Sequence, residues 1–224
     1  MLLSSLFRRC CRAFTTNLAL VVVLLTLVSG CVSIEVHQVD VTPEAAPDEL
    51  NGARWQVSKL EYCVVASGQG YVDHAQFVRL IDEAFERWGV AANNTGDCPG
   101  EQQSGNRRNE FAWGVLAQRQ DDLHEAGVTE VLFQSCGSRC SSGVPAQIVE
   151  ADVTISSDPP SRLRNRDCLF ATLLHETGHF LGMPHLASPA IMAPVTFDCP
   201  QRLTEADLDA LRRLYPSLSS LRLE

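Results

Sequence analysis

Apolar and polar positions alternate with two different periods along this chain, and these periods predict its secondary structure. Residues 54–66 alternate in the manner of a strand, and residues 72–90 have apolar side chains at helical spacing. Residues 91–108 are rich in Asn, Gly and Gln, which predicts a loop. Three further strands are predicted at 110–116, 129–134 and 147–156.

Two more helices are predicted in the second half of the chain. Residues 168–181 place leucine and phenylalanine side chains at helical spacing, with no proline before Pro184. Residues 203–215 predict the last helix, where Thr204 is followed three residues later by Asp207, close to a capping box. This order predicts the α+β class, with a twisted mixed β-sheet over a long helix and a C-terminal helix.

The first 30 residues have the pattern of an export signal. Residues 1–17 contain three arginines and no acidic residue, and residues 18–28 form an apolar run. This run is shorter than the roughly 20 residues that a membrane-spanning helix needs. It ends in Val-Ser-Gly-Cys, which resembles a bacterial lipobox, so we expect cleavage before Cys31 and lipid on its thiol. Ordinary signal cleavage, giving a soluble secreted protein, is the alternative.

We therefore divide the chain into three parts. Residues 1–30 are a lipoprotein signal peptide, 31–52 a lipid-anchored tether with two prolines, and 53–224 a single domain. The expected location is the outer membrane or the cell surface, and membrane contact is expected through the lipid anchor alone.

Cysteine usage agrees with export. Of nine cysteines, two lie in the signal and Cys31 would carry lipid. An even number remains, which in an oxidising compartment indicates disulfides with fifteen possible connectivities. Two candidate pairs are Cys136 with Cys140 and Cys168 with Cys199. The six remaining cysteines are Cys63, Cys98, Cys136, Cys140, Cys168 and Cys199.

Net charge narrows the choice of partners. The formal charge of the whole chain is −9, and it becomes −12 when the three arginines of residues 1–30 are removed. An acidic exported protein is a poor candidate for binding nucleic acid. We therefore expect no nucleic-acid partner, and we expect a monomer.

One segment carries the candidate chemistry. Residues 175–185 read HETGHFLGMPH and fit the pattern HExxHxxGxxH at every fixed position. On a helix, His175 and His179 lie one turn apart on the same face, so both rings can reach one metal ion. Gly182 can end the helix in the left-handed conformation, which lets the chain turn back and bring His185 as a third ligand.

Three nitrogen ligands leave the fourth position of a tetrahedral zinc ion open for water, which is typical of catalytic zinc. Zinc lowers the pKa of such a water towards about 7 and polarises a carbonyl group. Glu176 would be the general base that takes the proton of this water and delivers it to the leaving amine. The sequence thus predicts one catalytic Zn²⁺ ion.

The extended motif resembles that of the metzincins, a clan of zinc endopeptidases. Their second signature is a turn with a methionine beneath the metal, and Met192 in SPAIMAP stands at the matching place; an ordinary core methionine is the alternative. Within the clan the chain is most similar to the matrixins, the family of the matrix metalloproteinases. This resemblance also rests on AFERW (84–88), EADVTI (150–155) and LTEADLDALRRLY (203–215). Leu186 after the third histidine departs from the matrixin pattern.

The resemblance implies further expectations. The segment 150–155 resembles the edge strand of matrixins, so a substrate could add beside it as an extra strand. A second, structural zinc is unsupported. Calcium binding is unsupported as well, because the candidate carboxylates read as scattered surface groups. The expected edge-strand residues are Ala151, Asp152, Val153 and Thr154. The calcium candidates are Asp121, Asp122, Asp152 and Asp158.

The expected function is therefore hydrolysis of peptide bonds in a protein or peptide substrate by a zinc metalloendopeptidase. A protein of another class would show the same three histidines: a surface lipoprotein that contains zinc and binds peptides without cutting them. Glu176 favours the enzyme, because a pure binding protein has no use for a base at that position.

Overall fold

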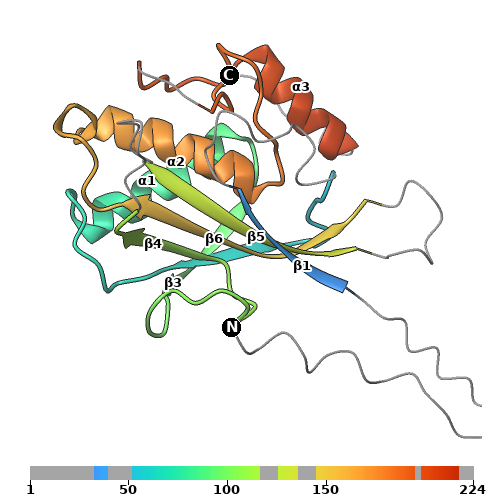
Figure 1. Cartoon of the computed structure of the whole chain (residues 1–224), viewed down its shortest axis with the longest axis horizontal. Helices are drawn as coiled ribbons and strands as arrows, with labels where there is room; N and C mark the ends of the chain where they lie inside the picture. The colour runs from blue at the N-terminus through green and yellow to red at the C-terminus, as the bar shows by residue number, and fades with distance from the viewer. Residues whose placement is uncertain (1–32, 40–51, 117–125, 136–144, 195–197, 217–224) are drawn as a thin grey trace, which may run out of the picture. The chain divides into compact units, whose positions relative to one another are not determined.

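The structure is a computed structural model that describes residues 33–39, 52–116, 126–135, 145–194 and 198–216 (Figure 1). These residues form an α+β fold, as the sequence predicts, with a six-stranded mixed sheet in the order β1-β5-β6-β4-β2-β3. The strands are β1 (Ser33–Val39), β2 (Leu60–Val64), β3 (Ala92–Asp97), β4 (Glu110–Gly114), β5 (Gly127–Ser135) and β6 (Gln147–Ser156). The helices are α1 (His74–Arg87), α2 (Arg166–Phe180) and α3 (Glu205–Leu214), with a short 3-10 turn at Ser161–Leu163.

Strand directions divide the sheet into two parts. Strands β3, β2, β4 and β6 run parallel to one another, whereas β5 runs antiparallel to both β6 and β1. The register places Val153 of β6 between Thr129 of β5 and Phe111 of β4. β6 is therefore an interior strand, paired on both sides.

Three sequence predictions are wrong at this level. The segment 31–52, expected to be only a tether, contains β1, and the loop expected at 91–108 contains β3. The four residues expected to form an edge strand lie in β6, which pairs with β5 at all four and with β4 at Val153 and Thr154, while Asn109 Oδ1 accepts the N–H of Ala151. An extra strand cannot add there. Those residues are Ala151, Asp152, Val153 and Thr154.

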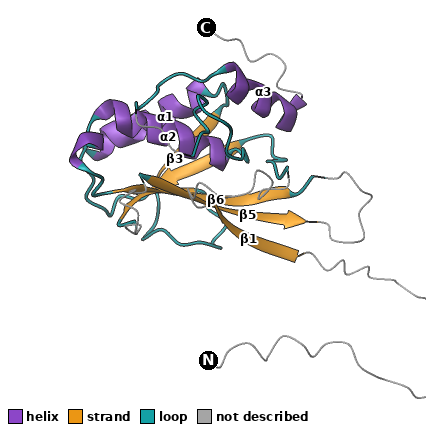
Figure 2. Ribbon diagram, turned by 45° about the horizontal axis from the view of Figure 1, so that its top comes forward, coloured by secondary structure: helices purple, strands orange, loops and turns teal. Residues whose placement is uncertain are grey.

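Helices α1 and α2 lie together on one face of the sheet (Figure 2). α1 begins at Asp73, whose carboxylate accepts the N–H of Gln76. It buries an apolar face that includes Phe77, Ile81 and Phe85. The indole of Trp88 then donates to the carbonyl of Leu174 in α2 at 2.8 Å, which fixes the two helices against each other.

Helix α2 carries most of the HExxH segment. It begins at Asn165, whose side chain accepts the N–H of Cys168, and it contacts α1, β5 and β6. Gly182 follows its end with φ 88°, and a Cβ there would lie 2.3 Å from the carbonyl oxygen of Ala53. Both the left-handed backbone and the close approach require glycine at position 182, so the helix ends at Phe180, one residue after His179.

Aromatic packing holds the end of α2 in place. The ring of Phe180, the last helical residue, packs on Phe85 and Phe111 with centroid distances of 5.3 and 5.6 Å. Phe111 in turn packs on Tyr62 of β2 at 5.2 Å. These rings are buried, so the residue next to His179 is anchored in the main core.

Among the described residues, no helix combines the length and the apolar character needed to cross a bilayer.

Candidate metal centre

The three motif histidines come together in the structure. His175 and His179 lie one turn apart on α2, and the chain reversal at Gly182 brings His185 against them. The Nε2 atom of His179 lies 3.0 Å from Nε2 of His175 and 3.1 Å from Nε2 of His185. Two nitrogens bound to one tetrahedral zinc ion, each at 2.0–2.1 Å, would be roughly 3.3 Å apart. The spacing therefore suits ligands that share one ion.

Backbone carbonyls fix the tautomers of two of these rings. Nδ1 of His175 donates to the carbonyl oxygen of Ile191 at 2.7 Å, and Nδ1 of His179 donates to that of Met183 at 2.8 Å. A carbonyl oxygen can only accept, so both Nδ1 atoms carry the proton. In a neutral ring Nε2 then holds a lone pair, and the two lone pairs face each other.

The rings are kept neutral by their surroundings. Burial lowers the pKa of His175, and burial together with the neighbouring imidazoles lowers the pKa of His179 well below its usual value. Burial, and to a lesser extent the neighbouring His175, lowers the pKa of His185 to about 4. Facing lone pairs on neutral rings cannot hydrogen-bond to one another. This donor set therefore fits a cation, and neutral imidazole is the form that binds zinc.

Met192 lies directly beneath α2. Its side chain is fully buried, and a Cβ at Gly178 would lie only 2.2 Å from its sulfur atom. Gly178 is the residue before His179, so the methionine and the metal-facing turn of α2 are in close contact. The turn around Met192 also carries Ile191, whose carbonyl accepts from His175.

The turn around Met192 is held by a residue from α3. The carboxylate of Asp207 is fully buried and accepts the N–H groups of Ile191 and Met192 at 3.0 and 3.1 Å. It also accepts the N–H and the hydroxyl of Thr204, both at 2.7 Å, which completes the capping box. Sequence analysis identified Asp207 only as a helix cap, and no sequence signal connects it to the turn.

Glu176 lies against β5. Its carboxylate is buried, and Oε2 accepts the hydroxyl of Thr129 at 2.7 Å. Gly127, two residues earlier on the same strand, touches the same side chain: a Cβ there would lie 2.7 Å from Cγ of Glu176. Sequence analysis identified neither Thr129 nor Gly127, because their contacts join segments almost fifty residues apart.

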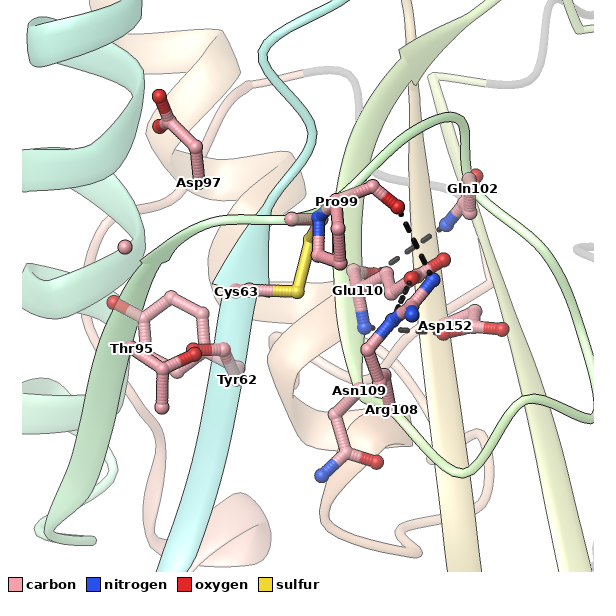
Figure 3. The surroundings of a disulfide bond; sticks show 12 residues. Tyr62, Cys63, Thr95, Asp97, Pro99, Gln102, Arg108, Asn109, Glu110 and Asp152 are labelled. Atoms are coloured by element: carbon pink, nitrogen blue, oxygen red, sulfur yellow. Dashed lines mark hydrogen bonds and ion pairs between the residues drawn. A yellow bond between two sulfur atoms is a disulfide. The ribbon is translucent and has the colours of Figure 1, made fainter.

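The cysteines that the structure describes form two disulfides. Cys168 at the start of α2 is joined to Cys199, one of the pairs suggested by the sequence, and Cys63 is joined to Cys98 (Figure 3). Cys63, Cys98 and Glu110 lie close enough to share an ion, but the two sulfurs are bonded to each other and offer no thiolate. Cys31, Cys136 and Cys140 lie outside the described residues.

A second group of buried polar residues lies at the other side of β6. We call Glu110, Glu150 and Asp152 the carboxylate cluster; all three are buried, with at most 5% exposed. Glu110 accepts from Gln103 N, Asn106 Nδ2 and Arg108 Nε at 2.8 to 3.0 Å.

The other two carboxylates of the cluster also have N–H donors. Glu150 accepts the backbone N–H groups of Gly105 and Arg107, and Asp152 accepts the N–H of Glu110 at 3.0 Å (Figure 3). Burial, reinforced by Glu150 and Glu110, raises the pKa of Asp152 to about 8.

Of the other calcium candidates, Asp158 alone lies in the described part of the chain. Asp158 pairs with Arg164. Asp121 and Asp122 lie outside the described residues.

Comparison with known protein families and with curated proteins finds no match to this chain.

Proposed function

We propose that this protein is a zinc-dependent endopeptidase of the metzincin type, most similar to the matrixins. The observation that carries the proposal is the convergence of three neutral histidines, with the Nε2 atoms of His175 and His185 within 3.1 Å of that of His179. The tautomers of His175 and His179 are fixed by backbone carbonyls. A buried methionine beneath α2 and a twisted sheet over it support the same assignment.

His175, His179 and His185 would hold the ion. When bound, zinc acts as a Lewis acid that polarises the substrate carbonyl and makes a water molecule acidic near neutral pH. Glu176 takes a proton from the attacking water as the new carbon–oxygen bond forms. It then gives this proton to the amide nitrogen as the carbon–nitrogen bond breaks, so that the products are a carboxylic acid and an amine.

The proposed location follows from the cysteines. Disulfides persist in exported proteins and are rare in the cytosol. The two disulfides in the described part of the chain support an oxidising compartment. We propose that the enzyme is an exported lipoprotein held by Cys31 and acts on extracytoplasmic proteins or peptides as a monomer. Because β6 is paired on both sides, strand addition to β6 is not part of this proposal.

The decisive experiment compares the wild-type protein with Glu176→Gln. Glutamine keeps the size of the side chain and an oxygen that can accept from Thr129, but it is not a base. Both proteins should bind one zinc ion per chain, measured by metal analysis after dialysis. Only the wild type should cleave an unfolded protein mixture, with a loss of about a thousandfold in the variant.

A matched control replaces a glutamate outside the centre. Glu86 lies exposed on α1, and Glu86→Gln should keep full activity and full zinc content. If wild type and Glu176→Gln both bind zinc and neither cleaves, the protein is a zinc-containing peptide-binding lipoprotein. If the wild type binds no zinc, the proposed metal centre is wrong.

A further inference from the structure

Strand β5 presents two residues to the side chain of Glu176. Residues 127 and 129 lie on the same face of β5, because side chains on a strand alternate between its faces. Thr129 is fully buried, and its Oγ1 lies 2.7 Å from Glu176 Oε2 and 3.2 Å from the backbone oxygen of Glu176. One hydroxyl thus spans both the side chain and the main chain of the same glutamate.

Gly127 closes the other side of the carboxylate. A Cβ on Gly127 would lie 2.7 Å from Cγ, 2.8 Å from Oε1 and 3.0 Å from Cδ of Glu176. These distances are shorter than carbon and oxygen atoms tolerate, so only glycine leaves room for the glutamate as it stands. From β5, the glutamate therefore receives a hydrogen bond at Oε2 from Thr129 and close packing of its side chain from Gly127.

The strand that forms this contact is itself fixed. Thr129 lies opposite Val153 of β6 and opposite Val39 of β1, so β5 is paired on both sides at this residue. A glutamate side chain has three rotatable bonds and loses conformational freedom when it is held. When a rigid strand holds a catalytic group, the group meets its reactant in one orientation. Such positioning raises the rate of the chemical step.

We infer that Thr129 is a positioning residue for Glu176: its hydroxyl, with Gly127 as the facing wall, sets the orientation in which the glutamate exchanges a proton with water. This inference rests on the proposed peptidase function. It concerns two residues of β5 that lie outside the zinc motif and that no sequence pattern identifies.

The test uses Thr129→Val and Thr129→Ser. Valine keeps the branched shape suited to a strand and lacks the hydroxyl, whereas serine keeps the hydroxyl. Thr129→Val should lower kcat about 10- to 100-fold, because it removes a hydrogen bond to the charged side chain of Glu176. KM should stay within about twofold of wild type, because no contact with the substrate is removed. Thr129→Ser should restore kcat to within about threefold of the wild type.

Thr154→Val is the matched control. Thr154 lies on the neighbouring strand β6, and its hydroxyl donates to Gln102 Oε1 at the same distance of 2.7 Å. Removing this hydroxyl should leave kcat unchanged. Gly127→Ala tests the wall independently of the hydroxyl, and it should lower kcat at least as much as Thr129→Val.

Two readouts separate positioning from simple stability. Zinc content and the midpoint of thermal unfolding should be close to wild type in Thr129→Val, and its crystal structure should show the Glu176 carboxylate displaced from Gly127. Unchanged kcat in Thr129→Val overturns the inference. Equal losses of kcat in the Val and Ser variants, with lost zinc, also overturn it and show a structural role. An inactive wild type would instead refute the proposed function, while the crystallographic comparison would still report on the orientation of Glu176.

Discussion

Two clusters of buried ionisable groups flank the same part of the sheet, and their hydrogen bonds run in opposite directions. In the carboxylate cluster, N–H groups of the loop at 103–108 point inward and meet Glu110 and Glu150. At the histidine centre, Nδ1–H groups point outward to the carbonyls of Ile191 and Met183. The carboxylates of the first cluster therefore have N–H donors, whereas in the histidine centre the acceptor atoms Nε2 face one another.

The contrast supports the histidine centre, and not the carboxylate cluster, as the proposed metal site. Buried polar groups are almost always paired, so a surplus of acceptors must be met from outside the protein. Glu110 and Glu150 already accept two or more N–H groups each, and these donors take the place of a cation. The facing Nε2 atoms of His175 and His179 have no proton between them. Burial and acidic groups alone therefore do not favour a metal site, whereas the direction of the hydrogen-bond donors favours the histidine centre.

The largest expected effect comes from His179→Ala. His179 is the central ring, within 3.1 Å of both other ligands, so its loss leaves two nitrogens and should abolish zinc binding and cleavage. Metal analysis and activity assays measure this directly. A chelator should lower the thermal midpoint of the wild type, by an amount equivalent to about 4 kcal/mol if zinc is present at a thousand times its Kd, and should leave the variant unaffected.

The control for this prediction is His74→Ala. His74 is an exposed residue that hydrogen-bonds to Asp97 at 2.9 Å and is not part of the histidine centre, so its loss should change neither zinc content nor activity. Zinc retained by His179→Ala at wild-type stoichiometry would contradict the contrast between the two clusters.

Asp207→Asn should produce the next largest effect. This carboxylate accepts four hydrogen bonds from Ile191, Met192 and Thr204, so it behaves like the carboxylate cluster although it borders the histidine centre. The amide would place an NH₂ group against N–H donors. We expect the free energy of unfolding to fall by about 3 kcal/mol, measured by chemical denaturation of the zinc-free protein.

Asp207→Glu and Asp209→Asn sharpen this test. Asp207→Glu keeps a carboxylate but moves it out of place for these hydrogen bonds, so this variant should also be less stable than the wild type. Asp209 lies exposed on the same helix and pairs with Arg212, so Asp209→Asn should have little effect. Wild-type stability of Asp207→Asn would show that the turn around Met192 is held by other contacts.

The convergence of the three histidines could be predicted from the sequence because their geometry is local. A helical turn places His175 and His179, and Gly182 sets the reversal that brings His185, all within eleven residues. The bounds of β6 were predicted at 147–156 and found at Gln147–Ser156, since its strand pattern is also local. Contacts that depend on how strands are ordered were beyond this reasoning.

The wrong predictions share that cause. β3 reads ANNTGD, with five of its six residues polar or glycine, and it is a strand only because its backbone pairs with β2. The segment 150–155 was placed at a sheet edge, but its burial on both faces from Glu150 to Val153 is typical of an interior strand. Thr129 and Asp207 meet their partners through tertiary packing, so no spacing in the sequence predicts their roles.

Asp152→Asn tests the carboxylate cluster through pH. Burial and the neighbouring Glu150 and Glu110 raise the pKa of Asp152 to about 8, whereas an unfolded aspartate titrates near 4. Between these values the folded protein keeps a proton that the unfolded chain has lost, so stability falls as pH rises from about 4 to about 8. Asparagine removes this dependence and keeps an oxygen for the N–H of Glu110. The variant should gain on the order of 2 kcal/mol over wild type at pH 9.

The measurement for Asp152→Asn is chemical denaturation of both proteins at pH 5, 7 and 9 without zinc. The other charged groups around the site, Glu130 and Arg108 among them, are present in both proteins, so their contribution cancels in the difference. If the two proteins showed the same dependence of stability on pH, the predicted protonation of Asp152 in the folded protein would be wrong.

Thr177→Val should have the smallest effect and the opposite sign. Thr177 lies inside the HExxH segment, and within the described part of the chain its hydroxyl is the one buried side-chain oxygen that lacks a hydrogen-bond partner. Valine has the same branched shape, so it removes an unpaired polar group without opening a cavity. We expect the free energy of unfolding to rise by about 1 kcal/mol, with zinc content and kcat unchanged. Thr177→Ser, which keeps the hydroxyl and loses a buried methyl, should be destabilised by a similar amount. A loss of zinc in Thr177→Val would show that this hydroxyl supports the histidine centre. The comparison of the two clusters, which considers only their hydrogen-bond donors and acceptors, would then be incomplete.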